Sequence, residues 1–431
     1  MARLNECILY RNFEHGEILD KMAELMNAWE QNAPDLKEKE GLFFECANGL
    51  VETAGSYGFS GNLWHCYLTF LLVNNENAFS TACEIRGAVN GSINELALND
   101  FGVFKELYDF DLTVLDEAFG ISCCKVLGDY TNTGSNSKMF NSRIRDRICD
   151  LSKTLAAAES TEEFMKDMVQ FYKDFGVGKL GLHKAFRVGH DENDNVEIQP
   201  ITRIAHVKLE DLVGYEIPKQ KLIENTEAFV RGRKANNCLL FGDAGTGKSS
   251  SIKGILNRYY DEGLRIIEVY KHQFQDLNEV IAQIKNRNYK FIIYMDDLSF
   301  EEFEIEYKYL KAVIEGGLEK KPDNILIYAT SNRRHLVRET FRDKQDRDEE
   351  LHTNDTVQEK LSLVARFGVK IYFASPAKKA FQKIVTELAK RNHISMPEEE
   401  LLLEVNKWEL SHGGMSGRTA QQFIDYLLGK E

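Results

Sequence analysis

The run with the clearest chemical meaning is GDAGTGKS at residues 242–249, which fits the pattern GxxxxGK[ST] between an apolar run and a helical one. Glycines let such a loop wrap so that its N–H groups face phosphate oxygens, and the helix N-terminus adds a positive dipole. Lys248 would neutralise the β- and γ-phosphates, and the Ser249 hydroxyl would hold Mg²⁺. The residues expected to bind nucleotide here are Gly242, Asp243, Ala244, Gly245, Thr246, Gly247, Lys248, Ser249 and Ser250.

Two adjacent carboxylates follow a second apolar run, FIIYM at residues 291–295. A nucleotide site of this kind needs a carboxylate for Mg²⁺ at the end of a neighbouring strand. We therefore predict that Asp296 joins Ser249 at the metal and that Asp297 orients the attacking water. A strand that merely ends in an acidic turn is the alternative interpretation.

A polar residue and two arginines complete the set. Asn332 follows the apolar run 325–331 and is predicted to contact the γ-phosphate or the lytic water, although Ser331 or Asn332 capping the next helix is an alternative. Phosphoryl transfer spreads negative charge over the equatorial oxygens, and a guanidinium stabilises it. Arg366 and Arg418 are the candidates for that role.

The elements around these residues change in character along the chain. From about 17 to 175 the apolar positions recur with a helical period and carry no motif of chemical interest, which predicts an all-α module. After a polar stretch that includes 189–200, short apolar runs alternate with helical ones, which predicts a parallel sheet covered on both faces. The expected domains are a helical module at 1–188, a linker at 189–204, an α/β nucleotide-binding core at 205–375 and a helical lid at 376–431.

The charge of the chain is unevenly distributed. The net charge of −14 lies entirely in residues 1–200, which hold 18 Lys and Arg against 32 Asp and Glu, whereas residues 201–431 hold 36 of each sign. Two such different balances indicate two modules, and the acidic one argues against binding nucleic acid through its phosphates. We expect its partner to be a basic protein.

Composition narrows the class of protein further. With 43% hydrophobic, 28% charged and 11% aromatic residues, the chain fits a globular protein rather than a disordered or fibrous one. The apolar runs are too short for a membrane span, and the first residues lack the apolar stretch of a signal peptide, so we expect a cytosolic protein without a transmembrane segment. The eight cysteines show neither a CxxC pair nor a zinc-like grouping with His, which predicts reduced and mostly buried thiols.

The order of these motifs resembles that of the AAA+ ATPases over about residues 205–428. Within that superfamily, LLFGDAGTGKSSSIKGIL, FIIYMDDLSFEEFE, YATSNRRHL and EKLSLVARFG resemble the bacterial group known as domain of unknown function 815, which itself resembles helicase-loader ATPases. The resemblance implies a sheet of strand order 5-1-4-3-2 and ATP or ADP bound between the core and the lid. It also implies that Arg366 acts in trans in a homo-oligomer and that Val213, Gly214 and Tyr215 contact the adenine.

One residue departs from the pattern of the superfamily. Many related ATPases carry Glu where Asp297 stands, and the shorter side chain leaves its role as a base open, with Glu301 or Glu302 as alternatives.

Three functions fit these observations. The first is an oligomeric ATPase that remodels or loads a macromolecular partner. The second is a nucleotide-dependent switch with slow turnover, and the third is a DNA-associated ATPase, indicated by the basic run 333–347. Acids are interspersed in that run, so we favour a surface loop or a subunit contact over a DNA-binding patch. No aromatic residue marks a pore loop for threading peptides, although Tyr270 and Phe274 are possible candidates.

Overall fold

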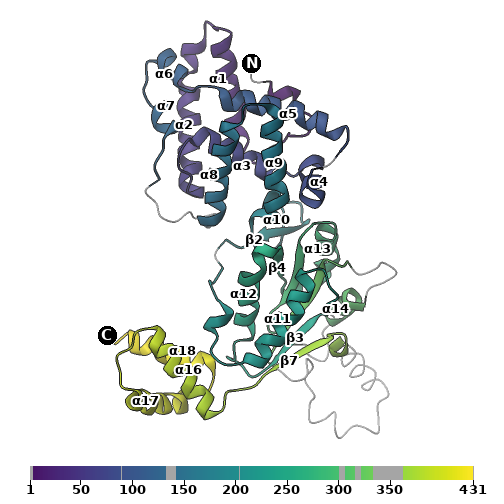
Figure 1. Ribbon diagram of the computed structural model, residues 1–431, viewed down its shortest axis with the longest axis vertical. Helices are drawn as coiled ribbons and strands as arrows, with labels where there is room; N and C mark the ends of the chain where they lie inside the picture. Colours follow the sequence, from purple (N-terminus) through teal and green to yellow (C-terminus); the bar gives the residue numbers. More distant parts are fainter. Residues whose placement is uncertain are drawn as a thin grey trace. The chain divides into compact units, whose positions relative to one another are not determined.

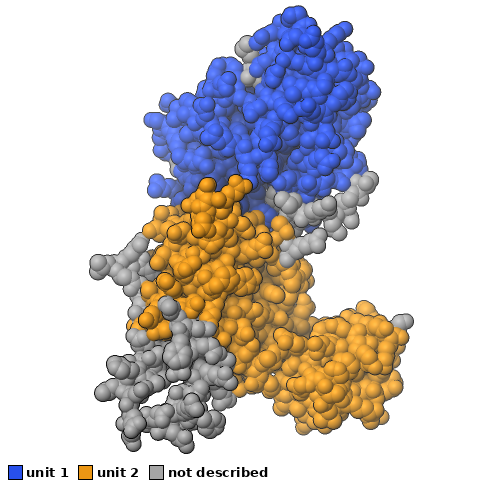
Figure 2. Space-filling model, turned by 180° about the vertical axis from the view of Figure 1, so that it is seen from behind, with its two compact units in different colours: residues 1–183 blue, residues 184–431 orange. Residues whose placement is uncertain are grey.

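The computed structural model of the chain describes residues 3–88, 90–132, 142–202, 204–299, 306–315, 322–332 and 363–430. It divides into two compact units, residues 1–183 and 184–431, which are coloured separately in Figure 2. The first unit thus ends five residues before the predicted boundary at residue 188. Glu301, Glu302 and the basic run 333–347 lie outside the described residues.

The first unit is helical, as its apolar periodicity predicts (Figure 1). Its α-helices are α1 (Glu17–Glu30), α2 (Glu40–Tyr57), α3 (Leu63–Asn74), α4 (Ala78–Arg86), α5 (Ile93–Asp109), α6 (Thr113–Phe119), α7 (Cys124–Gly128), α8 (Ser142–Ala157), α9 (Thr161–Phe175) and α10 (Gly178–Leu182). Two short 3₁₀ helices, Leu4–Glu6 and Leu36–Lys39, flank α1.

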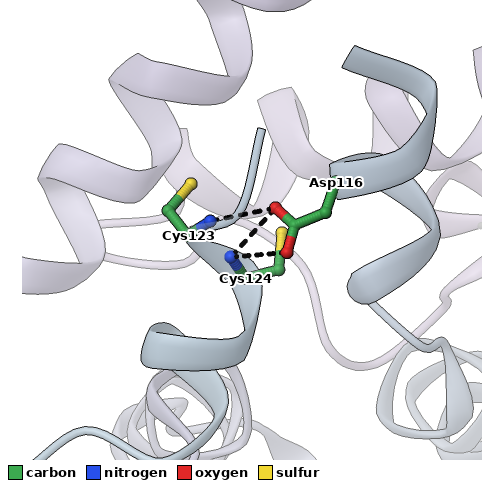
Figure 3. Close-up of side chains that lie close together, drawn as sticks. All are labelled: Asp116, Cys123 and Cys124. Atoms are coloured by element: carbon green, nitrogen blue, oxygen red, sulfur yellow. Dashed lines mark hydrogen bonds between the residues drawn. The ribbon is translucent and has the colours of Figure 1, made fainter. Parts of the chain in front are cut away.

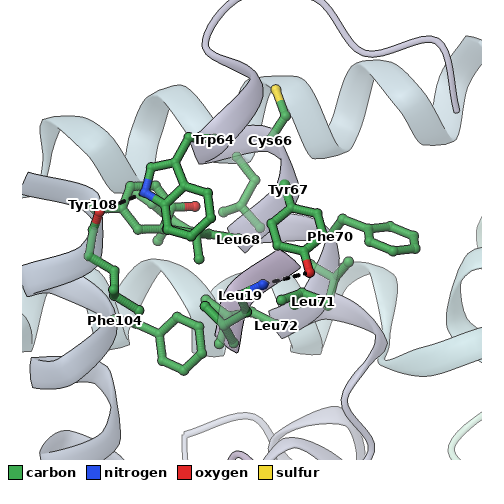
Figure 4. Packing of buried hydrophobic residues seen from close by; sticks show 14 of the residues in the cluster. Leu19, Trp64, Cys66, Tyr67, Leu68, Phe70, Leu71, Leu72, Phe104 and Tyr108 are labelled. Carbon is green, nitrogen blue, oxygen red and sulfur yellow. Dashed lines mark hydrogen bonds between the residues drawn. The ribbon is translucent and has the colours of Figure 1, made fainter. Parts of the chain in front are cut away.

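Helix α3 forms the centre of this unit, and Figure 4 shows its packing. Ten of its twelve residues are buried, because its sequence is apolar on every side. The aromatic side chains satisfy their polar ends inside the core. Trp64 Nε1 donates to the Leu107 carbonyl at 2.9 Å, and the Tyr67 hydroxyl accepts from the Leu19 N–H at 3.2 Å.

The second unit is built on one seven-stranded sheet of order β2-β1-β4-β5-β6-β3-β7. All neighbouring pairs are parallel except β1 and β2. The strands are β1 (Ala185–His190), β2 (Val196–Pro200), β3 (Cys238–Gly242), β4 (Leu264–Glu268), β5 (Lys290–Met295), β6 (Ile325–Ser331) and β7 (Val369–Phe373). The strand order 5-1-4-3-2, predicted from the resemblance to AAA+ ATPases, is therefore wrong for the sheet as a whole. It matches the run β7-β3-β6-β5-β4 but omits the two strands added beyond β4.

Those two strands also correct the predicted linker at 189–204. Strand β1 alternates inward and outward residues, with Phe186 and Val188 buried and Arg187 exposed, so it pairs as a strand although it is short. The polar stretch that follows is its turn, in which the Asp191 carboxylate accepts from the N–H groups of Asn193 and Asn195, both at 2.8 Å. The polar composition of this stretch indicates the turn, but it does not indicate the strands on either side.

Helices α11 (Glu216–Val230) and α12 (Lys248–Tyr259) cover one face of this sheet. Because side chains alternate across a strand, Ile292 and Tyr294 of β5 and Tyr328 of β6 point to that face. The remaining elements of the core are α13 (Leu277–Ile284), α14 (Glu306–Glu315) and the 3₁₀ helices Leu209–Asp211, Tyr260–Glu262 and Lys271–Asp276. The alternation of side chains along each strand therefore determines which residues face α12.

Three helices form the C-terminal subdomain: α16 (Lys378–Arg391), α17 (Glu398–Ser411) and α18 (Gly417–Leu428). They share a separate apolar cluster that includes Phe381, Val405 and Phe423. Pro376 and Pro397 lie just before the first turns of α16 and α17, a position where proline is common. Among the helices that the structure describes, none has the length and apolar character needed to cross a membrane.

Candidate functional site

The glycine-rich loop joins the end of β3 to the start of α12. Gly242, Gly245 and Gly247 have φ angles of 134°, 73° and 87°, which other residues rarely adopt. A Cβ atom on Gly242 would lie 2.1 Å from the carbonyl oxygen of Phe373, so only glycine lets the loop pass the end of β7. Gly247 precedes α12 directly, which places the N–H groups of the first helical turn at the loop.

Lys248 is folded against this loop and is only 6% exposed. Its Nζ donates to the carbonyl of Gly242 at 3.0 Å and to that of Asp243 at 2.6 Å. Burial lowers the pKa of Lys248, while the nearby carboxylates of Asp297 and Asp243 oppose that shift. These carbonyls satisfy the ammonium group, and an anion in the loop would compete with them for it.

The Asp296 carboxylate accepts hydrogen bonds from side chains of α12, β5 and β6. Its Oδ1 accepts from Ser249 Oγ at 2.8 Å, from the Tyr294 hydroxyl at 2.7 Å and from Thr330 Oγ1. Burial alone would raise the pKa of Asp296, but hydrogen bonds from Thr330, Tyr294 and Ser249 outweigh it and lower the pKa below its usual range. The carboxylate therefore stays ionised at neutral pH.

A hydroxyl and a carboxylate so close together suit a hard divalent cation. Mg²⁺ prefers oxygen ligands and is commonly bound through one or two carboxylates plus phosphate oxygens and water. Ser249 and Asp296 offer that donor set beside the phosphate-binding loop. The residues present thus fit Mg²⁺.

Asp297 has an unusual backbone conformation, with φ at 50°. Its N–H donates to Thr330 Oγ1 at 2.9 Å, and its Oδ1 accepts from Asn332 Nδ2 at 2.7 Å. Asp and Asn are among the few non-glycine residues that tolerate this region. The two strand ends β5 and β6 therefore hold both carboxylates at the same edge of the sheet.

The C-terminal subdomain reaches the loop through α18. The Arg418 N–H donates to the Gly245 carbonyl at 3.1 Å, and a Cβ atom on Gly245 would lie 2.9 Å from Ser416 Oγ. A second contact comes from Arg391, whose guanidinium donates to the carbonyl of Asp211 at 2.9 Å. The start of α18 is thus seated directly on the glycine-rich loop.

These elements enclose a cavity of about 670 Å³, within the range of small-molecule sites, roughly 300–1,000 Å³. Its polar residues come from the loop, α12 and the strand ends. Its apolar residues come from the segment before α11 and from α16, and they are Leu212, Val213, Tyr215, Ile384 and Leu388. The Tyr215 ring packs 5.6 Å from that of Phe373, and burial raises the pKa of Tyr215 to about 12. One cavity thus offers both an anion-binding wall and an apolar wall.

Most residues predicted from the sequence meet at this cavity. It is lined by Val213, Tyr215, Gly245, Thr246, Gly247, Lys248, Ser249, Ser250, Asp296, Asp297, Asn332 and Arg418. Gly214, Gly242, Asp243 and Ala244 do not line it. Of these, Asp243 braces the loop, because its Oδ2 accepts from the Ser375 N–H at 2.8 Å and its N–H donates to the Phe373 carbonyl at 3.1 Å.

Arg366 is not among the residues that line the cavity. It lies exposed on the segment that precedes β7. Of the two aromatic residues considered for a pore loop, Tyr270 is half exposed and Phe274 is buried.

Several lining residues were not predicted. Thr330 lies two residues before Asn332, so the period of a strand was a signal that could have found it. The same period relates Tyr294, which does not line the cavity, to its hydrogen-bond partner Asp296. Three other lining residues are direct sequence neighbours of predicted residues: Leu212, Ser251 and Gly417. The rest carry no such signal: Asp211, Lys219, Ile384, Leu388 and Gln421.

A cluster of Asp116, Cys123 and Cys124 lies in the first unit and is shown in Figure 3. The Asp116 carboxylate accepts from the N–H groups of Cys123 and Cys124, both at 3.1 Å, and so satisfies the start of α7. Burial raises the pKa of both thiols. All eight cysteines are free, and six of them are buried, in line with the sequence prediction.

A comparison with protein families adds an independent observation. The family model described as "Protein of unknown function (DUF815)" matches residues 182–431, more than half of the chain. The chain belongs to this family. The resemblance deduced from the motifs is thereby confirmed, and the DUF815 segment begins within a few residues of the second unit. No curated protein matches the chain.

Solved structures with some similarity include those of RuvB from Thermotoga maritima. A RuvB mutant matches with 16% identity and a TM-score of 0.37 over 52% of this chain and 65% of that one. The structure titled RuvB Holliday junction branch migration motor matches with 14% identity and a TM-score of 0.32 over 51% and 72%. The chain thus spans slightly less than two thirds of the first of these proteins, and at TM-scores below 0.5 the similarity is too distant to assign a function.

Proposed function

We propose that this DUF815 chain is an AAA+ ATPase that binds and hydrolyses ATP with Mg²⁺ and uses the cycle to remodel or load a macromolecular partner. The observation that carries the proposal is the hydrogen bond of 2.8 Å between Ser249 and Asp296. It joins the glycine-rich loop to the strand-end carboxylates on the wall of one cavity. A glycine-rich turn without such a partner would be compatible with many other roles.

Each part of the cavity has a role in this proposal. The loop N–H groups and Lys248 bind the phosphates, and the nucleobase lies against Val213 and Tyr215. Ser249 and Asp296 would hold Mg²⁺, which would supply positive charge to neutralise the phosphates. Asp297 accepts the proton of the attacking water, while Asn332 fixes the orientation of that carboxylate.

Arg418 and Arg366 supply positive charge from two different sources. Arg418 lines the cavity on the C-terminal subdomain, so rotation of that subdomain would bring its charge toward the phosphates or remove it. Arg366 is exposed and outside the cavity lining, which is compatible with action on a neighbouring subunit of a homo-oligomer. The acidic first unit would bind a basic protein partner. A cytosolic location is part of the same proposal.

A nucleotide-dependent switch with slow turnover is the second candidate. One observation favours it: the Asp297 carboxylate already accepts a hydrogen bond from Asn332 at 2.7 Å. In that bond Asn332 already occupies the Oδ1 atom that would otherwise accept from the attacking water. A DNA-associated ATPase is less favoured, because acids are interspersed in the basic run 333–347 that would carry it.

Measurements of ATP turnover and of oligomeric state distinguish the ATPase from the slow switch. We would measure ATP hydrolysis per subunit over a range of protein concentrations, with light scattering in the presence and absence of a non-hydrolysed ATP analogue. The proposal predicts that turnover per subunit rises with concentration as the oligomer forms. Arg366→Ala should abolish the rise, while the control Arg231→Ala, exposed at the end of α11, should keep it.

Other results would point elsewhere. Tight nucleotide binding with turnover at background would leave only the switch. A strict monomer with unchanged turnover at every concentration would contradict the role of Arg366 between subunits.

A further inference from the structure

Tyr294, the last residue but one of β5, bonds directly to the predicted metal ligand Asp296. A strand turns alternate side chains to the same face, so Tyr294 and Asp296 both point toward α12, which carries Ser249. Tyr294 is 5% exposed, and its hydroxyl donates to Asp296 Oδ1 at 2.7 Å. Its ring is fixed by the apolar cluster between the sheet and the two helices.

The three hydroxyls that donate to Asp296 differ in their other interactions. Ser249 is the predicted Mg²⁺ ligand, so its oxygen would turn to the ion and its bond to Asp296 would be lost or altered. Thr330 also accepts from the Asp297 N–H and is committed to that backbone. Tyr294 is therefore the donor on a rigid ring that can keep Asp296 oriented before and after an ion binds.

We infer that Tyr294 is a positioning residue that sets the affinity of the site for its divalent cation, a step that rests on the proposed function. The carboxylate of Asp296 faces the cavity, and without a fixed donor it would rotate between several rotamers. Residues that orient a metal ligand through hydrogen bonds commonly change metal affinity or activity by about 10- to 100-fold when they are removed. Tyr294 contributes through geometry, since it is not among the residues that line the cavity.

The test compares Tyr294→Phe with Tyr328→Phe. Both changes remove one hydroxyl from a buried tyrosine of the same sheet, but the Tyr328 hydroxyl bonds to Asn225 and Thr226 of α11 and lies away from the cavity. The full chain is titrated with Mn²⁺ in the presence of ADP, and free Mn²⁺ is followed by its electron paramagnetic resonance signal. The affinity for ADP is measured separately in EDTA, and urea unfolding checks that both variants are folded.

We expect Tyr294→Phe to raise the Kd for Mn²⁺ about tenfold and to leave the metal-free affinity for ADP unchanged. Tyr328→Phe should change neither. A Tyr294→Phe protein within twofold of wild type for Mn²⁺ overturns the inference while the proposed function stands. An equal loss of metal-free ADP binding also overturns it, because the tyrosine would then be structural. Wild-type protein that binds neither ADP nor Mn²⁺ overturns the proposed function itself.

Discussion

Asp297 provides the sharpest test of the catalytic reasoning, because its backbone and its side chain make separate predictions. We expect Asp297→Glu to impair the protein even though Glu stands here in many related ATPases. The φ angle of 50° lies in the left-handed region, and the bond between Asp297 Oδ1 and Asn332 Nδ2 is 2.7 Å long. A longer acid fits neither the backbone nor that distance.

The size of the effect follows from these two features. Asp and Asn occur several-fold more often than other non-glycine residues at positive φ, which corresponds to about 1 kcal/mol. Asp297→Glu should therefore lower the free energy of unfolding by about 1 kcal/mol. Asp297→Asn keeps a residue that tolerates this backbone, so its stability should stay within about 0.5 kcal/mol of wild type.

Activity should respond differently from stability. Loss of a general base costs about 10²- to 10⁴-fold in rate, so Asp297→Asn should lose turnover while it stays folded and binds ATP. Asp297→Glu should lose turnover as well, because its carboxylate is displaced from Asn332. The assays are urea unfolding and ATP hydrolysis at saturating ATP. An Asp297→Glu protein with wild-type stability and equal or higher turnover would refute the argument from positive φ.

Three further changes test the local structure. Gly242→Ala should lower the free energy of unfolding by about 3 kcal/mol, because the new Cβ would meet the Phe373 carbonyl at 2.1 Å; a change under 0.5 kcal/mol would contradict the packing. Burial lowers the pKa of His65, so the unfolded chain takes up a proton first as pH falls below about 6.5, and stability should decrease from pH 7 to pH 5. His65→Gln should flatten that decrease in urea unfolding, and an unchanged slope would exclude His65 as its cause. Asp116→Ala should cost about 1 kcal/mol in thermal unfolding because the start of α7 loses its acceptor, whereas full stability would show that water replaces it.

The polar half of the site could be predicted from the sequence because its geometry is local. The GxxxxGK[ST] run specifies its own turn, and Asp296 and Asn332 each follow an apolar run that ends at the same edge of a parallel sheet. Parallel strands place their carboxyl ends together, so residues far apart in the chain become neighbours without further information. The same logic explains why Ser249 reaches Asp296.

The parts that were missed depend on packing between distant segments. Ile384 and Leu388 reach the cavity only through the orientation of the C-terminal subdomain, which no spacing in the sequence specifies. The hairpin of β1 and β2 overlaps the predicted linker at 189–204, because its polar turn dominates a short pattern. Tyr294 is a different case, because its place two residues before Asp296 was a local signal for the bond between them.

The measurement that tests the central claim most directly is the affinity of the full chain for ATP with Mg²⁺, by isothermal titration calorimetry. Wild-type protein should bind one ATP per chain, and Lys248→Ala should weaken binding by about 10- to 100-fold, since a charged partner of the phosphates is lost. Lys253→Ala, exposed on the same helix and outside the cavity, should match wild type. An absence of ATP binding by the wild type, or equal affinity in Lys248→Ala, would contradict the assignment of this cavity to a nucleotide.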